Sequence, residues 1–198
     1  MFSNFSNEQR GTGLGVTAYL IWGFAALYWV QLQVIDTRDL LAHRVLWTVL
    51  AVVLSLLVAG RLTATLRLLR QPRNMAIMAA AAMFSAANWG VFIWAVTHER
   101  ATEASLGYFL LPLVNVVIGL TVFGELIDVA QKWAIGFAVA AVAVQFGYYG
   151  GLPLVALSLA LSFGLYGAIR KGVAIESMEG LFLEALIMLP FALGWLIY

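Results

Sequence analysis

Seven long apolar blocks divide this sequence and limit what the chain can fold into. A helix needs roughly 20 apolar residues to cross a hydrocarbon layer about 30 Å thick, whereas membrane strands are about half as long and alternate in polarity. With 63% hydrophobic and 11% charged residues, the composition also favours lipid as the solvent. The sequence therefore predicts an all-α membrane protein, a transmembrane helix bundle with spans at about 12–31, 40–60, 75–97, 104–123, 131–149, 152–169 and 180–198.

The basic residues predict the orientation of these spans. With a cytoplasmic N-terminus, eight of the eleven Lys and Arg residues lie in inner segments, and Arg38, Arg44 and Arg100 do not. By the positive-inside rule this distribution predicts a multi-pass protein with its N-terminus in the cytoplasm. The longest break, at about 61–74, leaves room for a short interfacial helix that carries arginines.

Several classes of partner are disfavoured by what the sequence contains. There is no cysteine, and His43 and His98 are isolated, so we expect no metal site, no cofactor and no catalytic residue. The net charge of +1 argues against a nucleic-acid surface, which needs a concentrated positive field. The expected partners are membrane lipid and a small-molecule substrate, and a homo-oligomer stays open.

Polar and aromatic residues follow one face of several spans. In the block 104–123, Ser105, Tyr108, Pro112, Asn115 and Gly119 fall within roughly 80° of one another on a helix. Because polar groups facing lipid are costly, we expect such faces on the first, third, fourth and sixth spans to meet around a shared cavity. The predicted lining residues are Tyr19, Trp22, Asn88, Trp89, Tyr108, Pro112, Asn115 and Tyr166.

A simpler interpretation competes for each of these residues. Asn88, Asn115 and the serines could serve as hydrogen-bonding contacts between helices, while Gly107 and Gly119 permit close packing. Such contacts need no open volume. The set as a whole favours a solute pathway, with aromatic walls suited to amphipathic small molecules.

Charged residues also occur at membrane depth. His43 and Arg44 stand about one turn inside the second block, and Glu184 stands about one turn inside the seventh. One interpretation makes these three residues gates or proton carriers, and the other makes them interfacial residues that extend to water. Glu103 begins the fourth span, where the helix dipole favours an acid, so a capping role suffices for it.

An internal repeat is visible between the two ends of the chain. Trp22 and Gly23 align with Tyr166 and Gly167, and the segment LLAHRVLW aligns with LFLEALIM at nearly the same offset. This pattern predicts one five-helix unit at 1–150 and the start of a second unit at 151–198. Because five is odd, the second unit would be inverted, as in many secondary transporters.

The motifs AYLIWG, HRVLW, NWGVFIWAV, EASLGYFLLPLVN, FGE and SFGLYGAIRK resemble the RarD proteins of the EamA branch of the drug/metabolite transporter superfamily. The resemblance implies an inner-membrane transporter of ten helices, built from two inverted units, that moves small metabolites or drugs by alternating access.

This sequence departs from that family in two ways. Leu126 follows the Gly-Glu pair, where the family often has a basic residue, and the chain ends at Tyr198 within the seventh block. We therefore expect the ten-helix fold to be incomplete at its C-terminus. The alternatives are a non-catalytic membrane subunit and a membrane-embedded enzyme.

Overall fold

The computed structural model of the protein describes residues 7–149 and 153–198, and over this range the regular secondary structure is all α-helix. The helices are α1 (Asn7–Val30), α2 (Thr37–Val58), α3 (Leu62–Leu68), α4 (Pro72–Thr97), α5 (Ala101–Thr121), α6 (Val129–Tyr149), α7 (Leu154–Lys171) and α8 (Ser177–Ile197). All but α3 are long and apolar enough to cross a membrane. The prediction of seven spans is confirmed, and α3 lies in the break for which a short helix was expected.

Local sequence signals explain where several of these helices begin and end. Asp36 caps α2, because its carboxylate Oδ1 accepts a hydrogen bond of 2.8 Å from the backbone N–H of Arg38. Pro72 opens α4, where a missing N–H costs nothing. Gly124 lies beyond the end of α5 at φ +63°, a conformation that favours glycine. The helix α5 itself continues past Pro112.

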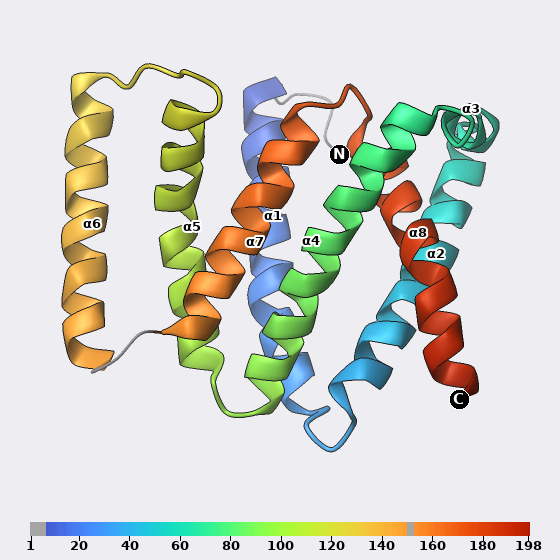
Figure 1. The fold of residues 1–198 in the computed structure, drawn as a ribbon, viewed down its shortest axis with the longest axis horizontal. Helices are drawn as coiled ribbons and strands as arrows, with labels where there is room; N and C mark the ends of the chain where they lie inside the picture. Colours follow the sequence, from blue (N-terminus) through green and yellow to red (C-terminus); the bar gives the residue numbers. More distant parts are fainter. Residues whose placement is uncertain (1–6, 150–152) are drawn as a thin grey trace.

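The helices run alternately in opposite directions across the bundle (Figure 1). In that view α5 and α6 lie on one side, α2 and α8 lie on the other, and α4 and α7 cross the middle. The helix α7 packs against α4 and α5, while α8 packs against α2 and α4. No described side chain of α1 or α6 is buried, so these two helices are peripheral.

Close contact between α5 and α7 depends on small residues. A Cβ atom at Gly107 of α5 would lie 2.9 Å from the Cβ of Leu159 and 3.0 Å from the carbonyl oxygen of Ala156, both on α7. A Cβ atom at Gly164 of α7 would likewise meet Val114 at 2.6 Å. Glycine therefore lets the two backbones approach, as is common in membrane bundles.

Candidate functional site

Three helices, α1, α4 and α5, bring aromatic rings together. Trp22 of α1 lies with its ring centroid 5.3 Å from that of Trp89 on α4. The series continues from Trp89 to Phe92 at 5.8 Å, and from Phe92 to Tyr108 of α5 at 6.0 Å. These separations are those of interacting aromatic pairs. Three of the predicted lining residues, on α1, α4 and α5, thus lie in one continuous cluster.

A cation from a fourth helix joins these rings. The guanidinium carbon of Arg44, on α2, lies 3.3 Å from the centroid of the Trp89 ring. Tyr108 lies within electrostatic range of Arg44 and close to the Trp22 side chain. A cation over a tryptophan face is attracted by the negative potential of that face. We refer to Trp22, Arg44, Trp89, Phe92 and Tyr108 as the arginine–aromatic cluster.

An open groove leads to Arg44 along α1 and α2. Its volume is about 900 Å³. Residues that line it include Tyr28, Trp29, Asp39, His43, Arg44 and Trp47. His43 is exposed in this groove, and the Asp39 carboxylate accepts a hydrogen bond of 2.8 Å from the indole N–H of Trp195. The groove therefore has aromatic surface, one guanidinium, one carboxylate, one imidazole and one phenol hydroxyl.

Asn88 precedes Trp89 in sequence but faces a different helix. It is buried, and its Nδ2 donates to the carbonyl oxygen of Leu159 at 2.9 Å and to Oγ of Ser162 at 3.0 Å, both on α7. Ser162 in turn donates to the carbonyl oxygen of Ser158 at 2.6 Å. In this conformation the Asn88 amide joins α4 to α7, which is the contact expected of a residue that holds helices together.

The other predicted lining residues lie apart from the arginine–aromatic cluster. Tyr19 is 83% exposed on α1. Pro112 is exposed in a separate groove of about 360 Å³ between α5 and α6. Asn115 is exposed near Gly164, and the Tyr166 ring stacks on Phe163 with a centroid distance of 5.5 Å. The structure therefore brings together Trp22, Trp89 and Tyr108, and leaves these four residues elsewhere.

A second charged cluster lies where α7 meets α4 and α8. Glu184 of α8 is 1% exposed, and its Oε1 lies 3.6 Å from Nε of Arg170, on α7. That oxygen makes no hydrogen bond within the described part of the chain, while the Tyr166 side chain lies close to that of Glu184. Arg170 also donates to the sulfur of Met78 at 3.3 Å. The predicted residues Tyr166 and Glu184 are thus neighbours.

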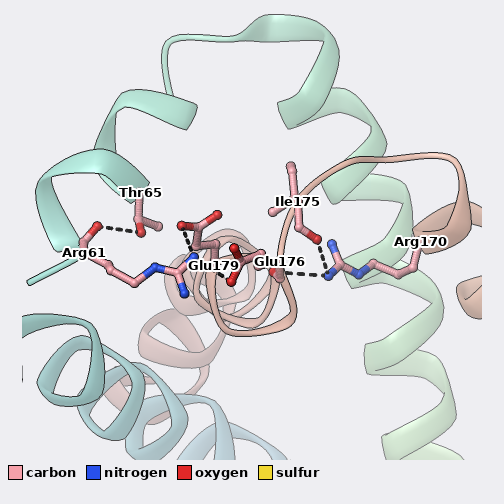
Figure 2. A network of polar contacts seen from close by, with 6 residues as sticks. All are labelled: Arg61, Thr65, Arg170, Ile175, Glu176 and Glu179. Carbon is pink, nitrogen blue, oxygen red and sulfur yellow. Dashed lines mark hydrogen bonds and ion pairs between the residues drawn. The ribbon is translucent and has the colours of Figure 1, made fainter. Parts of the chain in front are cut away.

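This second cluster continues into the adjoining loops, as Figure 2 shows. Arg61, which precedes α3, pairs with Glu176 at 2.6 Å and with Glu179 at 2.9 Å. Hydrogen bonds to Glu176 and Glu179 raise the pKa of Arg61 above its ordinary value. Arg170 donates to the carbonyl oxygens of Ile175 at 3.3 Å and of Glu176 at 3.5 Å. Together these contacts hold α3 and the end of α7 against the start of α8.

Two interactions escaped the sequence analysis. Arg170 was not singled out, although it contacts both Glu184 and the loop before α8. Glu103 is buried, pairs with Arg100 at 2.5 Å, and accepts a hydrogen bond of 2.9 Å from the backbone N–H of Val155. It therefore caps α7 as well as lying in the first turn of its own helix. No local signal could have indicated a partner 52 positions away.

Among residues 7–149 and 153–198, no three side chains of His, Cys, Asp or Glu lie close enough together to hold a metal ion. The arginine–aromatic cluster instead offers ring faces, one hydroxyl group and a guanidinium. Such groups interact by stacking, hydrogen bonding and charge.

Seven membrane-length helices around such contacts define a multi-pass helical membrane protein. Comparison with known proteins gives its family, because the EamA-like transporter family matches residues 9–147. The chain belongs to the EamA-like transporter family. The resemblance to RarD proteins noted in the sequence is thereby confirmed at the level of the family.

Individual relatives agree with this assignment. Protein RarD of Salmonella typhi is 39% identical over 184 residues, which are 93% of this chain and 63% of the relative. An uncharacterized transporter of Vibrio cholerae is 34% identical over 97% of this chain and 64% of its own length. The chloramphenicol-sensitive protein RarD of Pseudomonas aeruginosa is 33% identical over 93% and 63%. The chain thus spans less than two thirds of each of these relatives, and no solved structure matches it.

Proposed function

We propose that this protein is a secondary transporter of the inner membrane that moves small metabolites or drugs by alternating access. The solute path lies between α1, α4, α5 and α7. The observation that carries the proposal is the arginine–aromatic cluster, in which three of these helices and α2 converge. Burying polar and charged groups inside a membrane costs free energy, and transporters commonly place such groups at a shared solute site. The Vibrio cholerae relative is named as a transporter, which supports the same class.

The proposal assigns some residues to the solute path and others to gates on the two sides of the membrane. Contact among Trp22, Trp89 and Tyr108 supports their place in the path. The groove beside His43 and Arg44 supports a gating role for these two residues on one side of the membrane, and the Arg170 ion pair supports such a role for Glu184 on the other. We also assign to the path Tyr19, Asn88, Pro112, Asn115 and Tyr166.

The architecture that we propose is the ten-helix fold with inverted repeats. The family match at 9–147 supports the first unit at 1–150, and the second unit would begin at 151–198. Opposite directions of α1 and α7, and of α2 and α8, are compatible with inversion (Figure 1). We expect a half-turn about an axis in the membrane plane to superpose the first pair of helices on the second. The N-terminus lies in the cytoplasm in this proposal.

Uptake by proteoliposomes tests the function. The purified protein would be reconstituted and supplied with labelled amphipathic solutes, among them chloramphenicol because of the name of one relative. We expect solute uptake that falls severalfold in Trp89→Ala, since that ring lies at the centre of the cluster. Trp133→Ala is the matched control, because Trp133 is 67% exposed on the peripheral helix α6.

The same preparation separates the alternatives. Chemical conversion of a solute without flux would assign the protein to the membrane enzymes. Absence of both flux and conversion across the panel would favour a non-catalytic subunit. Equal losses of uptake in Trp89→Ala and Trp133→Ala would remove the arginine–aromatic cluster from the path.

A further inference from the structure

Arg44 differs from four other basic residues of the protein in the partners of its side chain. Arg61, Arg100, Arg170 and Lys171 each pair with a carboxylate. Within the described part of the chain, Arg44 forms neither an ion pair nor a side-chain hydrogen bond, and its described contacts are the Trp89 ring and Tyr108. Its position, seven residues after Thr37, is about 10 Å along α2 from the start of that helix.

A stacked guanidinium still has binding capacity. The Trp89 face stabilises the positive charge. With the guanidinium carbon 3.3 Å from the ring centroid, an edge-on guanidinium would press a nitrogen into the ring, so the flat side of the group faces Trp89. The five N–H donors of an arginine point outward in the plane of the group. They match two oxygens of a carboxylate or a phosphate, and stacking on an aromatic ring holds the group in a fixed orientation. Arg44 therefore has the geometry of an anion-binding residue.

The groups around Arg44 are compatible with this chemistry. The groove that it lines contains one carboxylate, Asp39, and that carboxylate is bonded to the Trp195 indole N–H and makes no ion pair with Arg44. His43 lies in the same groove and does not add negative charge. Trp29 and Trp47 supply apolar surface beside the guanidinium. A solute with an anionic end and an aromatic or aliphatic body would match both features.

We propose that Arg44 binds the anionic oxygen group, carboxylate or phosphate, of an amphipathic solute held in the groove between α1 and α2. The inference rests on the proposed function, because it treats the groove as part of the solute path. Trp89 orients the guanidinium, and the groove tryptophans contact the apolar body. Hydrogen bonds to charged groups are worth more than neutral ones, so the anion should bind about tenfold more tightly than a neutral analogue of the same shape.

Binding of a matched pair of probes to the purified protein in detergent tests this proposal. Phenylacetate and phenylacetamide share a ring and differ in charge, and intrinsic tryptophan fluorescence reports the dissociation constant of each. We expect the wild type to prefer the acid about tenfold, and Arg44→Gln to bind both probes with the affinity that the wild type shows for the amide. Arg44→Lys should keep part of the preference, since it retains the charge and loses the two-pronged geometry.

Arg38→Gln is the matched control, because Arg38 also lies over a tryptophan, with its guanidinium carbon 4.9 Å from the Trp195 centroid. An unchanged preference in this variant supports the proposal. Equal affinities of the wild type for the two probes would overturn it, as would an equal loss in Arg38→Gln. An amide affinity equal to that of the wild type shows that Arg44→Gln is folded. If Arg44→Gln does not fold, Arg44→Lys takes its place in the test. A preference for the acid as large in Arg44→Lys as in the wild type would overturn the two-pronged contact.

A lipid headgroup offers the same anionic oxygens, so the titration is repeated in nanodiscs of zwitterionic lipid with and without phosphatidylglycerol. Phenylacetate binding that is insensitive to phosphatidylglycerol supports a solute site. Displacement by this lipid, abolished in Arg44→Gln, would overturn the solute in favour of a headgroup. Uptake of neutral solutes without an anion preference would remove this inference and leave the transporter proposal standing. An anion preference without flux would support the role of Arg44 and contradict the transporter proposal.

Discussion

Replacing Gly107 by alanine tests the contact of α5 with α7, on which the shape of the bundle depends. The added methyl group would lie 2.9 Å from the Cβ of Leu159 and 3.0 Å from the carbonyl oxygen of Ala156. One of these atoms is backbone and the other is attached directly to it, so neither can turn away by a change of rotamer. The helices must move apart, and this movement would reach the neighbouring contacts of Leu159.

The size of the effect follows from two opposing terms. Overpacking a tight contact costs about 1–3 kcal/mol. Replacing glycine by alanine inside a helix returns about 0.5–1 kcal/mol, because the unfolded chain loses conformational freedom. We therefore expect Gly107→Ala to lower the free energy of unfolding by roughly 1–2 kcal/mol. For a chain of this length, that loss lowers the melting temperature by about 2–8 °C.

The assay is thermal unfolding in one detergent at one scan rate, because irreversible unfolding makes the melting temperature depend on the rate. Gly136→Ala is the control, since a Cβ atom at Gly136 of α6 would meet nothing within 4 Å. Its melting temperature should equal or exceed that of the wild type. If Gly107→Ala melts as high as Gly136→Ala, the close approach of α5 and α7 is wrong.

Asn88→Leu removes the hydrogen bonds from Asn88 to Leu159 and Ser162, and should lower the free energy of unfolding by about 0.6–1.7 kcal/mol, measured by thermal unfolding. If Asn88 only joins helices, initial uptake per folded molecule stays unchanged, and a lower rate per molecule would assign it to the path. Arg67→Cys and Glu99→Cys test the orientation, because the chain has no cysteine of its own. An impermeant thiol reagent applied to intact cells should label position 99 and not position 67, and the opposite pattern would reverse the topology.

The sequence predicted the helices well because length and polarity act locally. Each apolar block became a helix whose ends lie within a few residues of the predicted ones, since a helix satisfies its own backbone groups in lipid. The packing partners could not be predicted in the same way. Lipid is as apolar as the interior of the bundle, so hydrophobicity does not indicate which face meets another helix. Nothing in the composition of α1 or α6 marks these helices as peripheral.

The candidate site was predicted in part, for a similar reason. The cost of polar groups in lipid pointed to Trp22, Trp89 and Tyr108, and these three do meet. The same argument placed Asn88 and Trp89 on one face, although consecutive residues of a helix are about 100° apart. That angle is enough for Asn88 to face α7 while Trp89 faces Arg44. A stripe this wide can contact two different helices.

Arg170 and Arg44 have different kinds of partner within the protein. Arg170 contacts Glu184, Met78 and backbone carbonyl oxygens, so its donors are used within the protein. Arg44 lies seven residues after the first residue of α2 and meets an aromatic face, which leaves its in-plane donors for another molecule. One arginine therefore acts as a link between helices, whereas the other has the contacts of a binding residue. The difference lies on the neighbouring helices, which supply a carboxylate and a sulfur to Arg170 and an aromatic ring to Arg44.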